Sequence, residues 1–164
     1  MPATEQETPS LLRELEQLAE QAASAEELMQ AIVRRLAVSM PKYNWVGFYL
    51  IERGGNAADQ TLVLGPFVGA PTPHARIPLN KGICGAAATS GQTIVVDDVA
   101  SDPRYLACSV ETKSEIVAPV FVRGQVVGEL DIDSYFPAAF GPVDRELVEH
   151  CATLVGRYLE KKTA

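Results

Sequence analysis

The chain has 164 residues, of which 47% are apolar and 21% charged, a balance typical of one soluble globular domain. Its net charge is −7 and it has no long lysine- or arginine-rich run, which excludes the basic footprint needed for nucleic acid or an anionic membrane. We see no signal peptide, no apolar run of membrane-spanning length and no disulfide-scaffold spacing among the three cysteines, so we expect a cytoplasmic protein with reduced thiols.

The N-terminal part of the chain is expected to be helical. Residues 1–8 are polar and are expected to form a flexible N-terminus, which leaves a single domain over 9–164. A proline at the first helical position and leucines at helical spacing predict a helix up to about residue 22. Ser24 and Glu27 have the spacing of a capping box, so a second helix is expected to begin there.

Short apolar runs separated by turn residues fill the middle of the chain and predict strands. In order, we expect a strand over 43–51, a returning strand over 61–64 and a long loop over 65–73. A short extended segment at 76–78, a small helix opened by 82–85 and a strand over 93–96 follow. The chain is expected to end with a hairpin of 116–122 and 126–133 and a closing helix from Pro142. This order predicts the α+β class, with a central, mostly antiparallel sheet flanked by N- and C-terminal helices.

The last predicted strand places acidic residues on one face. Because side chains alternate along a strand, its two faces are Val127, Glu129, Asp131 and Asp133 on one side and Val126, Gly128, Leu130 and Ile132 on the other. An acidic face is either solvated or the wall of a pocket. If the hairpin brings Glu115 beside Asp131 and Asp133, three carboxylates converge, and they suit either an ammonium group or a hard divalent cation. The pattern alone leaves both ligands open.

The three cysteines lie in different surroundings. Cys108 is in a polar loop, where a thiol is either a reactive nucleophile or incidental. Cys84 opens the small helix within Gly-Ile-Cys-Gly; a helix N-terminus lowers a thiol pKa, although the glycines equally suit close backbone packing. Cys151 lies on the apolar stripe of the closing helix and is expected in the core. Trp45 and Tyr49 share a strand face that lines either a pocket or the core.

Seven short segments stand out when they are taken together. They are Asn44 to Leu50, Leu64 to Phe67, Arg76 to Pro78, Lys81 to Gly85, Ala107-Cys108, Ser114 to Ile116 and Leu130 to Ser134. Their residues, order and spacing resemble the free methionine-(R)-sulfoxide reductases, small single-domain enzymes with the GAF fold. The resemblance implies a GAF-like fold and an L-methionine (R)-S-oxide reductase that acts on the free amino acid. It implies no metal and no organic cofactor, only an external thiol reductant such as thioredoxin.

The resemblance also implies roles for particular residues. Cys108 matches the nucleophile and Cys84 a second cysteine, so a Cys108 sulfenic acid is expected to condense with Cys84 to a disulfide. The residues that match substrate-binding positions are Glu115, Asp131, Asp133 and Trp45, with the tryptophan expected near the sulfoxide methyl group.

The chain departs from the family's pattern at His74, where three-cysteine members carry their main resolving cysteine. Either Cys84 takes over that role, or the chain is a non-catalytic GAF domain that binds a small molecule or senses redox state. Expected partners are free methionine sulfoxide and a thioredoxin-like reductant. The N-terminal helix offers a homodimer surface, and no nucleic-acid or membrane partner is expected.

Overall fold

A six-stranded antiparallel sheet forms the centre of the computed structural model, which describes residues 8–53, 60–106 and 109–162. Its strand order is β3-β2-β1-β6-β5-β4, and every neighbouring pair is antiparallel. The strands are β1 (Trp45–Glu52), β2 (Thr61–Val68), β3 (Arg76–Pro78), β4 (Ile94–Val96), β5 (Ser114–Val122) and β6 (Gln125–Ser134). The predicted α+β class with a central antiparallel sheet is therefore confirmed.

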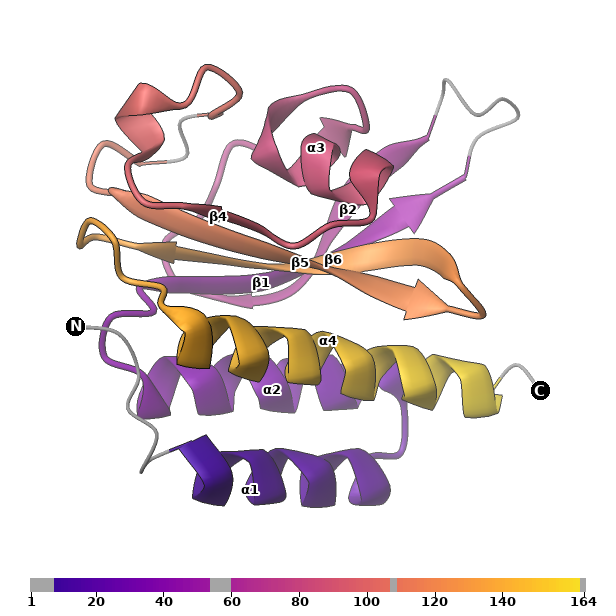
Figure 1. The fold of residues 1–164 in the computed structure, drawn as a ribbon. Coiled ribbons are helices and arrows are strands. Elements are labelled where there is room, and N and C mark those ends of the chain that lie inside the picture. Colours follow the sequence, from indigo (N-terminus) through magenta and orange to yellow (C-terminus); the bar gives the residue numbers. More distant parts are fainter. Residues whose placement is uncertain (1–7, 54–59, 107–108, 163–164) are drawn as a thin grey trace.

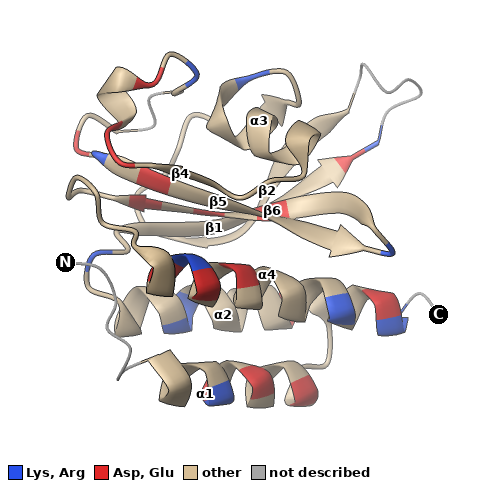
Figure 2. Cartoon of the chain, in the orientation of Figure 1, with Lys and Arg blue, Asp and Glu red and all other residues tan. Residues whose placement is uncertain are grey.

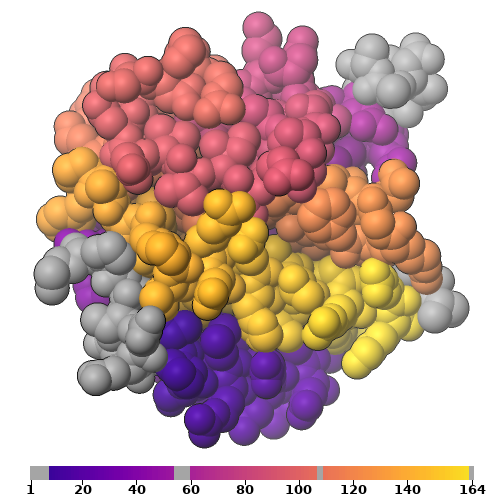
Figure 3. Space-filling view, viewed as in Figure 1, coloured from indigo at the N-terminus to yellow at the C-terminus, as the bar shows by residue number. Residues whose placement is uncertain are grey.

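Helices cover both faces of this sheet (Figure 1). One face carries the three long helices α1 (Thr8–Gln21), α2 (Ala25–Ser39) and α4 (Pro142–Lys162), and the other carries the shorter α3 (Gly82–Ser90), with the 3-10 helix η2 (Val99–Ser101) after β4. A large apolar core lies between the sheet and the long helices, and a smaller apolar cluster lies under α3. In the space-filling view α1 and α4 adjoin along one side of the molecule (Figure 3).

The predicted capping box opens α2. The Ser24 hydroxyl accepts the backbone N–H of Glu27 at 3.1 Å, and the Glu27 carboxylate accepts the N–H of Ala23 at 2.6 Å. Two helix-end donors are thus satisfied by local side chains, which is why the sequence alone predicted this boundary. Across the described ranges, no helix combines the length and the apolar character needed to cross a membrane.

Strand β2 is longer than the sequence predicted. The expected loop from residue 65 onward begins only after Val68, because β2 continues through Gly65-Pro66. The β1–β2 register shifts between Gly47 and Tyr49, so the proline sits at an irregularity of the ladder. Proline has no N–H to donate, and bulges are among the few places where a sheet accepts it.

A second register shift corrects the predicted faces of β6. Val120 pairs with Gly128 but Phe121 pairs with Val126, which leaves Val127 as the additional residue of a bulge. Val127 therefore packs against the large core and Val126 against the cluster under α3, the reverse of strict alternation. Beyond the bulge, the alternation of the acidic residues is as predicted.

Candidate functional site

The sheet brings the predicted acidic residues together on the face covered by α3. Glu115 lies directly opposite Asp133 in the β5–β6 pairing, and Asp131 is two residues away along β6. Only 5%, 4% and 3% of the surfaces of Glu115, Asp131 and Asp133 are exposed. Figure 2 shows acidic residues within these central strands. The acidic face is therefore part of the interior and not a solvated surface.

Cys84 approaches this cluster from α3. Its Sγ donates a hydrogen bond to Oδ2 of Asp131 at 3.4 Å, and only 6% of its surface is exposed. The helix packs closely because Gly85 has no side chain: a Cβ there would lie 2.6 Å from the carbonyl oxygen of Leu79. The glycine beside the cysteine is thus required by backbone packing, and it allows the thiol to reach the carboxylates.

Burial raises the pKa of every acidic group in the cluster. For Glu115 burial is the largest cause of its much raised pKa, followed by the charges of Asp131 and Asp133. The pKa values of Glu129 and Asp133 are also well above their usual range, chiefly through burial. The pKa of Asp131 is raised less strongly, because hydrogen bonds from Glu115 and Cys84 oppose the effect of burial. These two hydrogen bonds favour the ionised form of Asp131.

The same environment reverses the expected ionisation of Cys84. Burial, then the charges of Asp131, Glu129 and Glu115, raises the pKa of Cys84 well above its usual range. The sequence left two readings of Cys84 open, a thiol whose pKa is lowered by the helix N-terminus and a residue placed by close backbone packing. The direction of the pKa shift disagrees with the first reading, because desolvation and neighbouring carboxyl groups raise the pKa.

A small cavity of about 20 Å³ lies between α3 and the sheet. Its lining includes Tyr49, His74, Cys84, Leu106, Glu115 and Asp131. A cavity of this size holds about one water molecule. Oδ1 of Asp131, Oδ1 of Asp133 and both carboxyl oxygens of Glu129 have no hydrogen-bond partner within the described part of the chain. Buried oxygens of this kind are available for a ligand.

Trp45 lies in the apolar cluster under α3 but does not line the cavity. Its indole N–H donates to the carbonyl of Ala70 at 3.0 Å, and its ring stacks on Phe67 at a centroid distance of 5.7 Å. A Cβ at Gly47 would lie 2.4 Å from the indole, so this glycine makes room for it. Tyr49, whose ring centroid is 6.2 Å from that of the indole, does line the cavity.

The remaining sequence candidates are spread through the structure. Cys108, the expected nucleophile, lies outside the described residues. His74 lines the cavity, and its backbone carbonyl accepts the hydroxyl of Tyr49 at 2.8 Å. Cys151 is fully buried in the core on the other face of the sheet, as expected, and burial raises its pKa to about 12.

Glu129 is the residue that the sequence reasoning left out of the site. It is fully buried, and its charge helps to raise the pKa of Cys84. Its spacing from Asp131 and Asp133 had placed it on the same face of β6, so the signal was present. Only the position of α3 shows that this face includes the cysteine.

The sequence pattern of the GAF domain matches residues 24–159. The chain belongs to the GAF domain family. Within it, this GAF domain is related to free methionine-R-sulfoxide reductases. The enzyme of that name from Saccharomyces cerevisiae is 38% identical over 136 residues, which make up 82% of this chain and 72% of the relative.

Solved structures of such reductases share the fold of this GAF domain. The free methionine-R-sulfoxide reductase of Neisseria meningitidis, solved in complex with its substrate, has a TM-score of 0.88 and 30% identity, covering 100% of this chain and 97% of that chain. The type II free methionine-R-sulfoxide reductase of Thermoplasma acidophilum has a TM-score of 0.77 and 40% identity, covering 88% of this chain and 96% of that chain.

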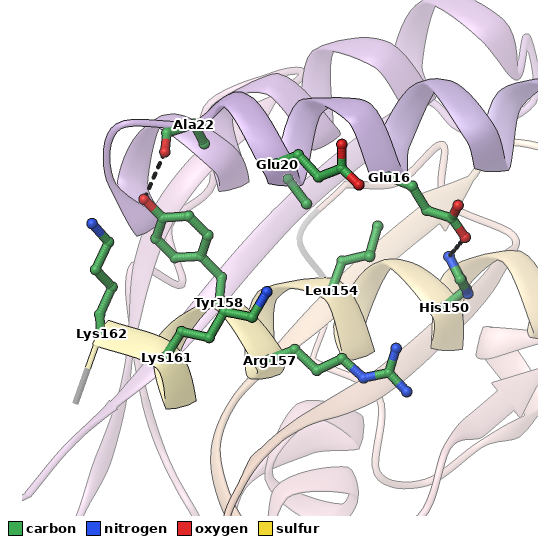
Figure 4. Close-up of a pocket in the computed structure, with 10 residues that line it drawn as sticks. Glu16, Glu20, Ala22, His150, Leu154, Arg157, Tyr158, Lys161 and Lys162 are labelled. Carbon is green, nitrogen blue, oxygen red and sulfur yellow. Dashed lines mark hydrogen bonds and ion pairs between the residues drawn. The ribbon is translucent and has the colours of Figure 1, made fainter. Parts of the chain in front are cut away.

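A larger groove of about 520 Å³ lies between α1 and α4, away from the acidic cluster (Figure 4). Glu16 and Glu20 line its α1 side, and Arg157 and Lys161 line its α4 side. Glu16 also pairs with His150 at 3.2 Å. None of the predicted site residues that the structure describes lines this groove. The small cavity under α3 is therefore the candidate site, although it is much the smaller of the two.

Proposed function

We propose that this GAF domain reduces free L-methionine-(R)-sulfoxide to methionine with electrons from a thiol reductant. The observation that carries the proposal is the acid-lined cavity under α3, in which Glu115 and Asp131 lie against the Cys84 thiol. The similarity to the yeast, Neisseria and Thermoplasma reductases supports the same activity.

In this proposal the buried carboxyl groups divide the work of binding and protonation. Asp131, whose ionised form is favoured by hydrogen bonds from Glu115 and Cys84, accepts the substrate ammonium in a charge-assisted hydrogen bond. Burial raises the pKa values of Glu115 and Asp133 well above their usual range, which favours the protonated forms that can donate to the sulfoxide oxygen. Trp45 packs near the sulfoxide methyl group. The substrate is larger than the cavity, so its binding requires the lining side chains to separate.

The proposed chemistry transfers oxygen from substrate to protein and then releases it as water. Cys108 attacks the sulfoxide sulfur and the S–O bond of the substrate breaks; the methionine sulfur gains two electrons, and Cys108 loses two and becomes a sulfenic acid. The Cys84 thiol then displaces this hydroxyl, which leaves as water with the thiol proton as the disulfide forms. Asp131, which accepts the Cys84 hydrogen bond, is the base that accepts the thiol proton and passes it to the departing hydroxyl. Thioredoxin or another dithiol reduces the disulfide by exchange.

The test is methionine formation from the free R and S sulfoxides, with dithiothreitol and then with thioredoxin. We expect turnover of the R form only, lost in Cys108→Ser and retained in Cys151→Ser, the matched variant at a core cysteine. Activity with dithiothreitol alone would mean that recycling by thioredoxin was lost with the cysteine missing at His74. Protein that binds the sulfoxide without any turnover would refute the reductase.

The second candidate is a GAF domain that binds a small molecule or senses redox state without turnover. It is favoured by the raised pKa of Cys84, which leaves little thiolate, and by the absence of a resolving cysteine at His74. Asp133→Asn separates the two. It should abolish sulfoxide reduction in an enzyme, whereas it should leave the rate of thiol oxidation unchanged in a redox sensor.

The cellular setting and assembly that we propose follow from this chemistry. A thiol enzyme recycled by thioredoxin belongs in the reducing cytoplasm. Because Leu11 and Leu15 of α1 are buried within the protein, a homodimer would use the opposite face of that helix. Sedimentation of the purified protein tests this, and a monomer at all concentrations would exclude the dimer.

A further inference from the structure

The cavity under α3 has the donor set of a transition-metal site. Cys84 offers a sulfur atom, and Glu115 and Asp131 offer one carboxylate oxygen each; these three atoms all lie within 4.8 Å of one another. They come from three different elements, α3, β5 and β6, so the packed fold holds them in place. Softer divalent metals combine sulfur and oxygen ligands in this way.

The spacing of two of the donors, Sγ of Cys84 and Oδ2 of Asp131, suits tetrahedral coordination, and the Glu115 oxygen lies within 4.8 Å of the cluster's other donor atoms. With typical zinc–sulfur and zinc–oxygen bond lengths, two ligands of a tetrahedral ion are about 3.5 Å apart. Sγ of Cys84 and Oδ2 of Asp131 are 3.4 Å apart. The other carboxyl oxygen of the buried Asp131, Oδ1, has no hydrogen-bond partner within the described ranges and is available for a ligand. The cavity of about 20 Å³ has the volume of about one water molecule, which is enough to receive the ion itself.

We propose that a thiophilic divalent cation such as Zn²⁺ or Cd²⁺ binds Cys84, Glu115 and Asp131. If the proposed function holds, the ion inhibits the enzyme, because it occupies the carboxylates that receive the substrate ammonium. Mg²⁺ and Ca²⁺ do not substitute, since they need six or more oxygen ligands and have little affinity for sulfur. The ion displaces protons from its ligands, so it binds more tightly as the pH rises.

Titration with Co²⁺ tests the site, because a cobalt–thiolate bond produces a charge-transfer absorption in the near ultraviolet. The protein used is the full chain with Cys108→Ser, so that Cys108 contributes no thiolate. We expect a saturable absorption that Zn²⁺ abolishes and Mg²⁺ does not. Adding Cys84→Ser should remove the absorption and weaken binding by at least about tenfold. Adding Cys151→Ser instead should leave the absorption and the Co²⁺ affinity unchanged, since Cys151 lies in the core between the sheet and the long helices.

Other outcomes separate this proposal from the proposed function. No charge-transfer absorption, or one that survives Cys84→Ser in protein with unchanged circular dichroism, would overturn the metal site. Displacement of Co²⁺ by free methionine sulfoxide would support a shared site. Metal binding through Cys84 in a protein without reductase activity would support the metal site and refute only the reductase.

Discussion

Replacing Glu129 by glutamine is expected to stabilise the protein, and more so as the pH rises. Glu129 is fully buried on β6, and neither carboxyl oxygen has a hydrogen-bond partner in the described part of the chain. Burial is the largest cause of its strongly raised pKa; the Cys84 thiol opposes that rise and the charge of Asp131 adds to it. Glutamine has nearly the same shape and is neutral at every pH.

The magnitude follows from proton linkage. An unfolded glutamate ionises at about pH 4.3, so between that pH and the raised folded pKa the protein takes up a proton when it folds. The stabilising contribution of the neutral carboxyl is complete below the unfolded pKa. It is lost at about 1.4 kcal/mol per pH unit as the pH rises towards the folded pKa. The glutamine variant avoids this loss, because its side chain has no proton to release in either state.

Urea unfolding from about pH 5 to about pH 8 in the presence of a chelator measures the effect. The difference in unfolding free energy between Glu129→Gln and the parent protein should grow by about 1.4 kcal/mol per pH unit until the folded pKa is passed. Glu146→Gln, at an exposed position on α4, is the matched control and should show no such growth. A difference that stays constant or shrinks over this range would refute the reasoning.

Three further substitutions test local packing by the same unfolding assay. Gly47→Ala places a Cβ 2.4 Å from the Trp45 ring. It should lower the free energy of unfolding by about 1–3 kcal/mol and shift the fluorescence of the single tryptophan. An unshifted spectrum would contradict the close contact. Gly85→Ala meets a backbone carbonyl at 2.6 Å and should cost a similar amount, whereas Gly65→Ala, whose nearest neighbour is at 3.4 Å, should cost much less. Ser24→Ala removes the α2 cap and should cost about 1 kcal/mol; unchanged stability would mean that the cap contributes nothing.

Most elements could be predicted from the sequence because their signals are local. Helical spacing, the capping residues Ser24 and Glu27, and the turn at Arg123 and Gly124, both with positive φ, act within a few residues of the chain. The two bulges could not be predicted in this way. The register of β1 near Gly47, and the extra residue Val127 in β6, depend on which residues the partner strand presents.

The sequence by itself determined that Asp131 and Asp133 share a strand face, since alternation is a property of the strand. The resemblance of short segments identified the family, and the comparisons confirm it. Only the tertiary structure decided that α3 covers this face and brings the Cys84 thiol to Asp131. It also decided the direction of the thiol pKa. A helix dipole can be predicted from local sequence, but desolvation and the approach of carboxyl groups from other strands arise only when the chain is packed.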